Sequence, residues 1–124
     1  MNRHLNLLHE AQPSPVTLAS ELLVKQCHTG AAAIDTSCVM SGYSKETLAE
    51  LIGKPREVLS RASSGRGGLD IDVLISLIKE SGTSLIIQYM AKELGGRFTF
   101  LTDDELAIEE AESKLAEMKA RMRA

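Results

Sequence analysis

Glycine-containing breaks divide the chain from Ser44 onward into short segments, each with the hydrophobic spacing of an amphipathic helix. The breaks are Gly53, the glycine-rich loop 63–68, Ser81-Gly82-Thr83 and Gly95-Gly96. The clearest i, i+3, i+4, i+7 pattern is formed by Ile71, Leu74, Ile75 and Ile78. No segment of any length alternates as a β-strand would. The sequence therefore predicts an all-α fold, a compact helical bundle.

Three regions are expected along the chain. Residues 1–15 predict a flexible N-terminal arm, because Gln12-Pro13-Ser14-Pro15 cannot continue a helix. Residues 16–101 predict a helical domain, and residues 102–124 a separate C-terminal helix. Within the domain, Thr17 is expected to cap a helix over 18–28 that Gly30 ends. Later helices are expected over 31–40, over 45–52 and 70–81 (capped by Ser44 and Asp70), over 55–62, and over 84–94 with Leu85, Ile86, Tyr89 and Met90 facing inward.

Composition excludes several classes of protein. The 124 residues are 44% hydrophobic and 25% charged, which is typical of one soluble domain. Aromatic residues are only 3%, which argues against a base-stacking surface for single-stranded nucleic acid. No apolar stretch is long enough to span a membrane, and the N-terminus lacks a signal-peptide pattern. Two cysteines are too few for a secreted disulfide framework, so we expect a cytoplasmic protein with reduced thiols.

Catalytic and metal-binding patterns are weak. The candidate metal ligands match no common zinc spacing, and inert or buried thiols are the better interpretation of the cysteines. These candidates are His4, His9, Cys27, His28 and Cys38. The chain also has no nucleophile elbow, phosphate loop or paired-carboxylate signature. We therefore expect no enzyme activity, no bound metal and no cofactor.

The segment from Lys45 to Gly65 has the pattern of two short helices joined by a tight turn. Ala49 is small enough to let the second helix cross the first closely, and Gly53 can supply the positive φ that the turn requires. Leu48, Ile52 and Leu59 would then hold the pair against neighbouring helices. These are the features of a helix-turn-helix.

The motif Leu48-Ala49-x-x-x-Gly53, followed by Leu59-Ser60-Arg61 and a loop ending at Gly65, resembles the lambda-repressor-like (Cro/CI, XRE) helix-turn-helix. The run from Leu69 to Gly96, including Met90-Ala91-Lys92-Glu93-Leu94-Gly95, is similar to the CII-type phage regulatory proteins. The resemblance covers roughly residues 44–96. It implies a sequence-specific transcriptional regulator of phage or prophage type that binds double-stranded DNA.

In such a unit the second helix enters the major groove, and its N-terminal residues meet base edges. The base-contact candidates are Arg56, Glu57, Ser60 and Arg61. The phosphate-contact candidates are Lys45, Lys54 and Arg66, with the backbone amides of the glycine loop. The alternative is that these are ordinary solvated charges on a helical surface.

The C-terminal helix begins with a capping box, Thr102 to Glu105. An apolar stripe spaced 3, 4, 3, 4 follows and is typical of a self-association seam. It consists of Ile108, Ala111, Leu115, Met118 and Met122. The prediction is a homo-oligomer, with dimer and tetramer both open. The alternative is a helix that folds back on its own domain.

The formal net charge of −3 hides an uneven distribution. Residues 103–124 hold seven acidic and four basic residues, whereas residues 54–68 hold four bases against Glu57 alone. The acidity therefore belongs to the association helix, and the expected DNA face is modestly basic. The acidic tail also motivates a rival interpretation, a helical interaction module that binds a protein partner, such as a regulator it antagonises, rather than DNA.

Overall fold

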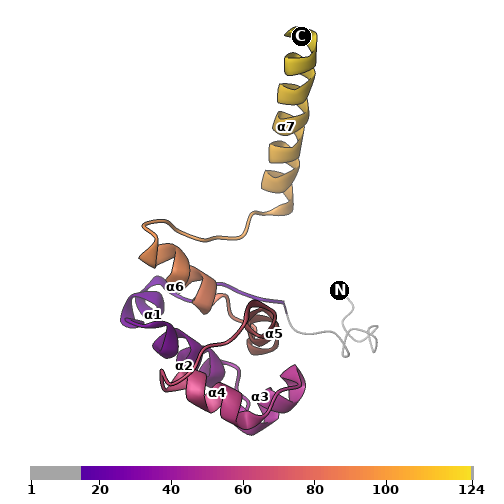
Figure 1. Ribbon diagram of the computed structural model, residues 1–124. Coiled ribbons are helices and arrows are strands. Elements are labelled where there is room, and N and C mark those ends of the chain that lie inside the picture. Colours follow the sequence, from indigo (N-terminus) through magenta and orange to yellow (C-terminus); the bar gives the residue numbers. More distant parts are fainter. Residues whose placement is uncertain (1–14, 124) are drawn as a thin grey trace, which may run out of the picture.

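The computed structural model describes residues 15–123, which form seven helices (Figure 1). Six of them make up a helical body: α1 (Glu21–Gln26), α2 (Gly30–Met40), α3 (Lys45–Ile52), α4 (Arg56–Ser63), α5 (Ile71–Ser81) and α6 (Leu85–Glu93). The seventh, α7 (Asp103–Arg123), follows a connector over 94–102. Within the described residues the one β-type pairing is an isolated bridge between Thr17 and Thr83. The all-α prediction is confirmed, and the expected arm 1–15 lies almost entirely outside the described residues.

Local sequence signals set most helix ends in the helical body. The side chains of Ser44 and Asp70 accept the backbone N–H groups of Thr47 and Val73, at 3.1 and 2.9 Å, as N-caps. Gly82 ends α5 in the left-handed conformation, with φ of 75°. The predicted caps of α3 and α5 are therefore confirmed.

The segment before α1 differs from the prediction. Thr17 does not cap a helix over 18–28, because its backbone is bonded to a turn far along the chain. Its N–H donates to the Gly82 carbonyl at 3.0 Å, and its carbonyl accepts from the Ser84 N–H at 2.9 Å. The helix begins only at Glu21, where the Ser20 hydroxyl accepts the Leu23 N–H.

The predicted break at Gly30 is also misplaced. α1 ends at Gln26, and Gly30 is the first residue of α2. The Thr29 side chain accepts the Ala32 N–H at 3.0 Å, so a β-region threonine starts the next helix. A side-chain cap thus decides this boundary rather than the flexibility of the glycine.

A buried glutamine fastens the N-terminal segment to α6. Gln88 is 8% exposed, and its Nε2 donates to the Ala19 carbonyl at 2.9 Å. Its Oε1 accepts from the Ala19 N–H at 2.8 Å and from the Ser84 hydroxyl at 2.9 Å. These bonds satisfy the backbone polar groups of Ala19 inside the protein.

The core lies between α2 and the helices around it. α2 packs against α4, α5 and α6, and its buried side chains are all small: Ala33, Ser37 and Cys38. Small side chains allow neighbouring helices to approach closely. The remaining fully buried leucines are Leu48, Leu59, Leu77 and Leu85.

Two inward faces are rotated from the expected ones. In α5 the buried residues are Val73, Leu77, Ile78 and Ser81, whereas Ile71 and Ile75 are exposed. In α6 Leu85 and Ile86 are buried as predicted, but Met90 is 43% exposed. The apolar side chains of α5 cover a broad arc of the helix, so its neighbours α2 and α3 determine which part of that arc is buried. Spacing alone does not distinguish the two faces.

Candidate nucleic-acid interface

The turn between α3 and α4 is built around Gly53. This residue has φ of 84° and ψ of 30°, the left-handed region that a side chain disfavours. The N–H groups of Gly53 and Lys54 both donate to the Ala49 carbonyl, at 2.8 and 3.0 Å. Pro55 then precedes α4 with φ of −63°. The chain reverses over three residues, and the positive φ expected for Gly53 is confirmed.

The inner sides of α3 and α4 are closed by small and branched side chains. Leu48 and Leu59 are fully buried, and Ala49 and Ala62 are each 1% exposed. α4 packs on both α3 and α2. Because Leu59 and Ala62 point into the core, the residues on the other side of α4 are held outward.

That outward side carries the four residues predicted to meet base edges. Arg56, Glu57 and Arg61 are exposed and Ser60 is half-buried. Their spacing over one turn of α4 places them on a single helix face, which we call the α4 face. Of the salt bridges within residues 15–123, none involves Arg56 or Arg61. The α4 face therefore presents two guanidinium groups without an internal acidic partner.

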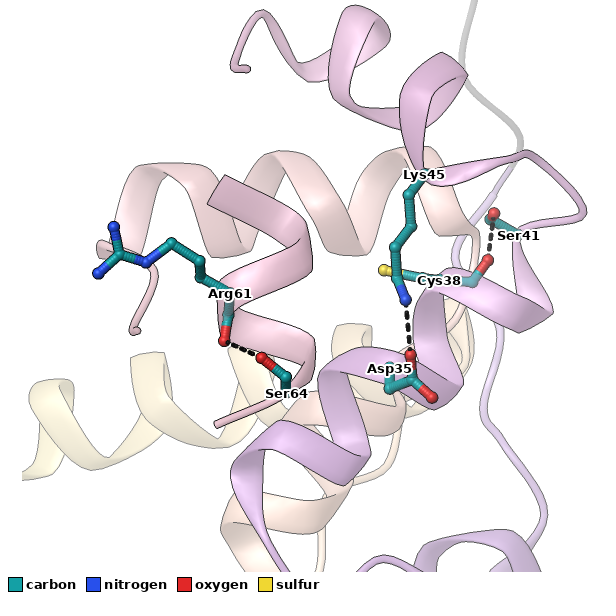
Figure 2. Close-up of polar contacts among 6 residues, drawn as sticks. All are labelled: Asp35, Cys38, Ser41, Lys45, Arg61 and Ser64. Atoms are coloured by element: carbon teal, nitrogen blue, oxygen red, sulfur yellow. Dashed lines mark hydrogen bonds and ion pairs between the residues drawn. The ribbon is translucent and has the colours of Figure 1, made fainter. Parts of the chain in front are cut away.

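The loop after α4 folds back against Arg61. The Arg66 N–H donates to the Arg61 carbonyl at 2.8 Å, and the Ser64 hydroxyl donates to the same carbonyl at 3.2 Å, as Figure 2 shows for Ser64. Arg66 Nε donates to Ser64 Oγ at 3.1 Å. A Cβ built on Gly67 would lie 3.4 Å from Arg61 Cβ, at van der Waals contact, so the loop passes close to this side chain. The loop thus holds Arg66 next to the end of the α4 face.

The three phosphate-contact candidates differ in their surroundings. Lys54 and Arg66 are exposed, and neither is in a salt bridge within the described chain. Lys45 Nζ instead lies 3.0 Å from Asp35 Oδ1 of α2, and the two side chains are 32% and 47% exposed (Figure 2). The pair joins α2 to the start of α3. No local sequence pattern predicts this partner, since Asp35 lies on a different helix.

Beneath α4, α2 presents a buried thiol. Cys38 is 2% exposed, and burial raises the pKa of its thiol, while the Ser63 hydroxyl and the Lys45 ammonium oppose the shift. Ser63 Oγ is buried and makes no hydrogen bond of good geometry with the described residues. The polar group beside it is the Cys38 thiol. Cys27 is likewise a buried free cysteine. Neither cysteine is in a disulfide.

α7 presents the predicted apolar stripe to solvent. No residue of α7 is buried, and the helix stands away from the helical body in Figure 1. The α7 stripe consists of Ile108, Ala111, Leu115, Met118 and Met122. Leu115 and Met118 are each 51% exposed, and Met122 is 83% exposed. Nothing within residues 15–123 covers the α7 stripe.

Other parts of the helical body offer little chemistry. A cavity of about 150 Å³ lies between α1, α6 and the connector. Two of the three cations that line it are already engaged: Lys92 Nζ donates to the carbonyls of Val24 and Cys27, and Arg97 pairs with Glu21 at 3.4 Å. The described residues contain no group of three His, Cys, Asp or Glu side chains that could hold a metal ion. None of their helices is both long and apolar enough to cross a bilayer.

The features above come from this chain alone. A comparison with protein-family models, with curated proteins and with solved structures finds no match to it.

Proposed function

We propose that the chain is a sequence-specific double-stranded DNA-binding transcriptional regulator, in which α3, the Gly53 turn and α4 act as a helix-turn-helix. The observation that carries the proposal is the α4 face together with Arg66. Three exposed guanidinium groups, those of Arg56, Arg61 and Arg66, lie on one helix and its following loop, free of acidic partners in the described chain. Arginine is the side chain best suited to bidentate contacts with guanine.

The roles of the individual side chains follow from groove geometry. With α4 in the major groove, Arg56, Glu57, Ser60 and Arg61 would meet base edges, because the N-terminal part of a recognition helix lies deepest. Lys54 and Arg66, at the two ends of α4, would meet phosphates and fix the orientation of the helix. Lys45 would reach a phosphate only by leaving Asp35. The resemblance of residues 44–96 to lambda-repressor-like and CII-type regulators agrees with these roles.

Self-association is the second part of the proposal. The net charge of residues 54–68 is +3, which supports only weak binding of DNA by a single copy of the chain. Two linked copies would gain affinity by binding adjacent half-sites. The exposed α7 stripe is the surface we propose for this association, because an apolar helical face of this kind requires burial.

The test combines selection from random DNA with matched variants. Wild-type chain is expected to enrich one sequence at low salt. Arg56→Ala and Arg61→Ala should each weaken binding to that sequence by about 1–3 kcal/mol and relax the preference at one base pair. Arg66→Ala should weaken binding to all sequences and reduce the slope of log K against log salt by about one.

Lys79→Ala serves as the control, since it removes one exposed charge from α5, outside the α4 face. It should leave affinity and sequence preference within about twofold of wild type. Failure to enrich any sequence would overturn the DNA proposal. So would unchanged DNA association in the double variant Arg56→Ala, Arg61→Ala together with loss of a protein partner, which is the outcome expected of an interaction module.

A further inference from the structure

The charges of α7 are divided between its two halves. Residues 103–113 hold six acidic side chains and no basic one: Asp103, Asp104, Glu105, Glu109, Glu110 and Glu112. Residues 114–123 hold four basic side chains, Lys114, Lys119, Arg121 and Arg123, against Glu117 alone. The α7 stripe runs through both halves, so any helix that covers it contacts both signs of charge.

The helix dipole accounts for only part of this division. Acidic groups stabilise the first turn of a helix and basic groups the last, and the effect falls off beyond those turns. Asp103, Asp104 and Glu105 are in the first turn. Glu109, Glu110 and Glu112 lie one to two turns further in, and Lys114 lies mid-helix, so the dipole gives no reason for their positions.

We propose that α7 pairs with α7 of a second copy of this chain in the antiparallel orientation, so that the acidic half of each helix lies along the basic half of the other. The inference rests on the self-association proposed above and specifies its partner and geometry. A second copy of this chain fits the charge pattern of α7, because an identical helix running in the opposite direction places its basic half opposite the acidic half. In either orientation the apolar residues of the α7 stripe can pack together.

The parallel orientation places like charges together. The acidic half of one helix would lie beside the acidic half of its partner, and the basic halves would also lie together. Lys114 and Lys119 flank the α7 stripe on opposite sides, one turn apart, and a parallel pair would bring Lys114 of one copy toward Lys119 of the other. Since packed helices are about 8–10 Å apart, these charges interact within one Debye length at moderate salt.

The antiparallel pair also has a consequence for DNA reading. Twenty-one helical residues span about 30 Å. The two connectors would leave the pair at opposite ends, roughly that distance apart. Half-sites one helical turn apart on DNA are separated by 34–36 Å. The pair can therefore present two helical bodies to adjacent half-sites through the short connectors over 94–102.

The first test is the sign of the salt effect on self-association of the full chain, measured by sedimentation equilibrium without DNA. Antiparallel pairing predicts that raising NaCl from about 50 to about 500 mM weakens association roughly three- to tenfold, because attraction is screened. Parallel pairing predicts the opposite sign. Association that is unchanged or strengthened by salt, or a chain that stays monomeric at high concentration, would overturn the inference.

The second test measures distances with one nitroxide label per chain, introduced through Leu106→Cys or Ser113→Cys. Both positions are exposed, and the native Cys27 and Cys38 are buried, so the unsubstituted chain gives the background. Positions 106 and 113 are seven residues apart and both face away from the α7 stripe, so in an antiparallel pair the labels at 106 should be at least about 5 Å further apart than those at 113, near the centre. Equal separations at the two positions would overturn the inference.

The two proposals fail separately in these tests. A monomer that still selects a DNA sequence would overturn the pairing and leave the DNA proposal intact. A chain that pairs antiparallel but enriches no DNA sequence would do the reverse.

Discussion

The helical body and α7 are both helical but are determined by different forces. In the helical body, six helices of 11 residues or fewer are held by a common core, with four leucines fully buried. α7 is 21 residues long and buries nothing within the described chain. Its features are local: a capping box at its start, and acidic and basic residues in the turns where the helix dipole favours them.

This difference separates two sources of helix stability. Short helices are marginal in water, so α1 to α6 depend on tertiary packing. α7 is long enough to have intrinsic helicity, but its apolar stripe gains nothing until another surface covers it. The helical body is therefore expected to fold as a unit on its own, whereas the stability of α7 should depend on concentration.

The largest expected effect comes from one substitution made in both regions. Leu59→Ala should lower the free energy of unfolding of the helical body by about 2–5 kcal/mol, because Leu59 is fully buried. Leu115→Ala, on the exposed α7 stripe, should change it by less than about 0.5 kcal/mol and instead weaken self-association. Urea unfolding followed by Tyr43 and Tyr89 fluorescence measures the free energy of unfolding, and sedimentation measures self-association. An equal loss of stability in both variants would show that α7 packs against its own helical body.

A smaller effect is expected at the polar contact that closes the helical body. Gln88→Met keeps the length of the side chain but leaves the Ala19 N–H and carbonyl without partners, so it should cost about 1–3 kcal/mol. Amide exchange at Ala19 should become faster. Gln26→Met makes the same substitution at an exposed position of α1 and should cost less than about 0.5 kcal/mol. If the two variants lose the same stability, hydrogen bonding by Gln88 is not what holds the N-terminal segment.

Gln88 also marks the limit of what the sequence could predict. Most signals that act within a few residues are predicted correctly: the Ser44 and Asp70 caps, the positive φ of Gly53 and the capping box at Thr102. The exception is Thr29, whose side chain caps α2 where a break at Gly30 is predicted. The predicted start of α1 is wrong, because the backbone of Thr17 is hydrogen-bonded to residues more than sixty positions away. No local pattern encodes such a contact.

In the candidate interface, too, features set by local helical spacing are predictable from the sequence and features set by distant contacts are not. The outward direction of Arg56 and Arg61 follows from the burial of Leu59 on the same helix, so helical spacing was sufficient to predict it. The pairing of Lys45 with Asp35 depends on how α2 packs beside α3, and it was not foreseen. The exposure of Ile71 and Ile75 in α5 has a similar cause, since neighbouring helices determine which part of its broad apolar arc is covered.

The smallest expected effect is the pH dependence of the first turn of α7, which tests whether a local capping contact stabilises the start of this helix. The Thr102 N–H donates to Glu105 Oε1 at 2.9 Å and, with the Thr102 hydroxyl, holds the pKa of Glu105 below its ordinary value. A lowered pKa in the folded state means that the stabilisation is present above the ordinary pKa and is lost as pH falls through the folded value. The amide signals of residues 105–108 should therefore show increasing fraying in wild type as the pH falls below the ordinary pKa of a glutamate. Glu105→Gln preserves the capping box but does not titrate, so its first turn should fray less over that range. Identical profiles in the two chains would mean that acidic groups elsewhere, and not this local contact, control the start of α7.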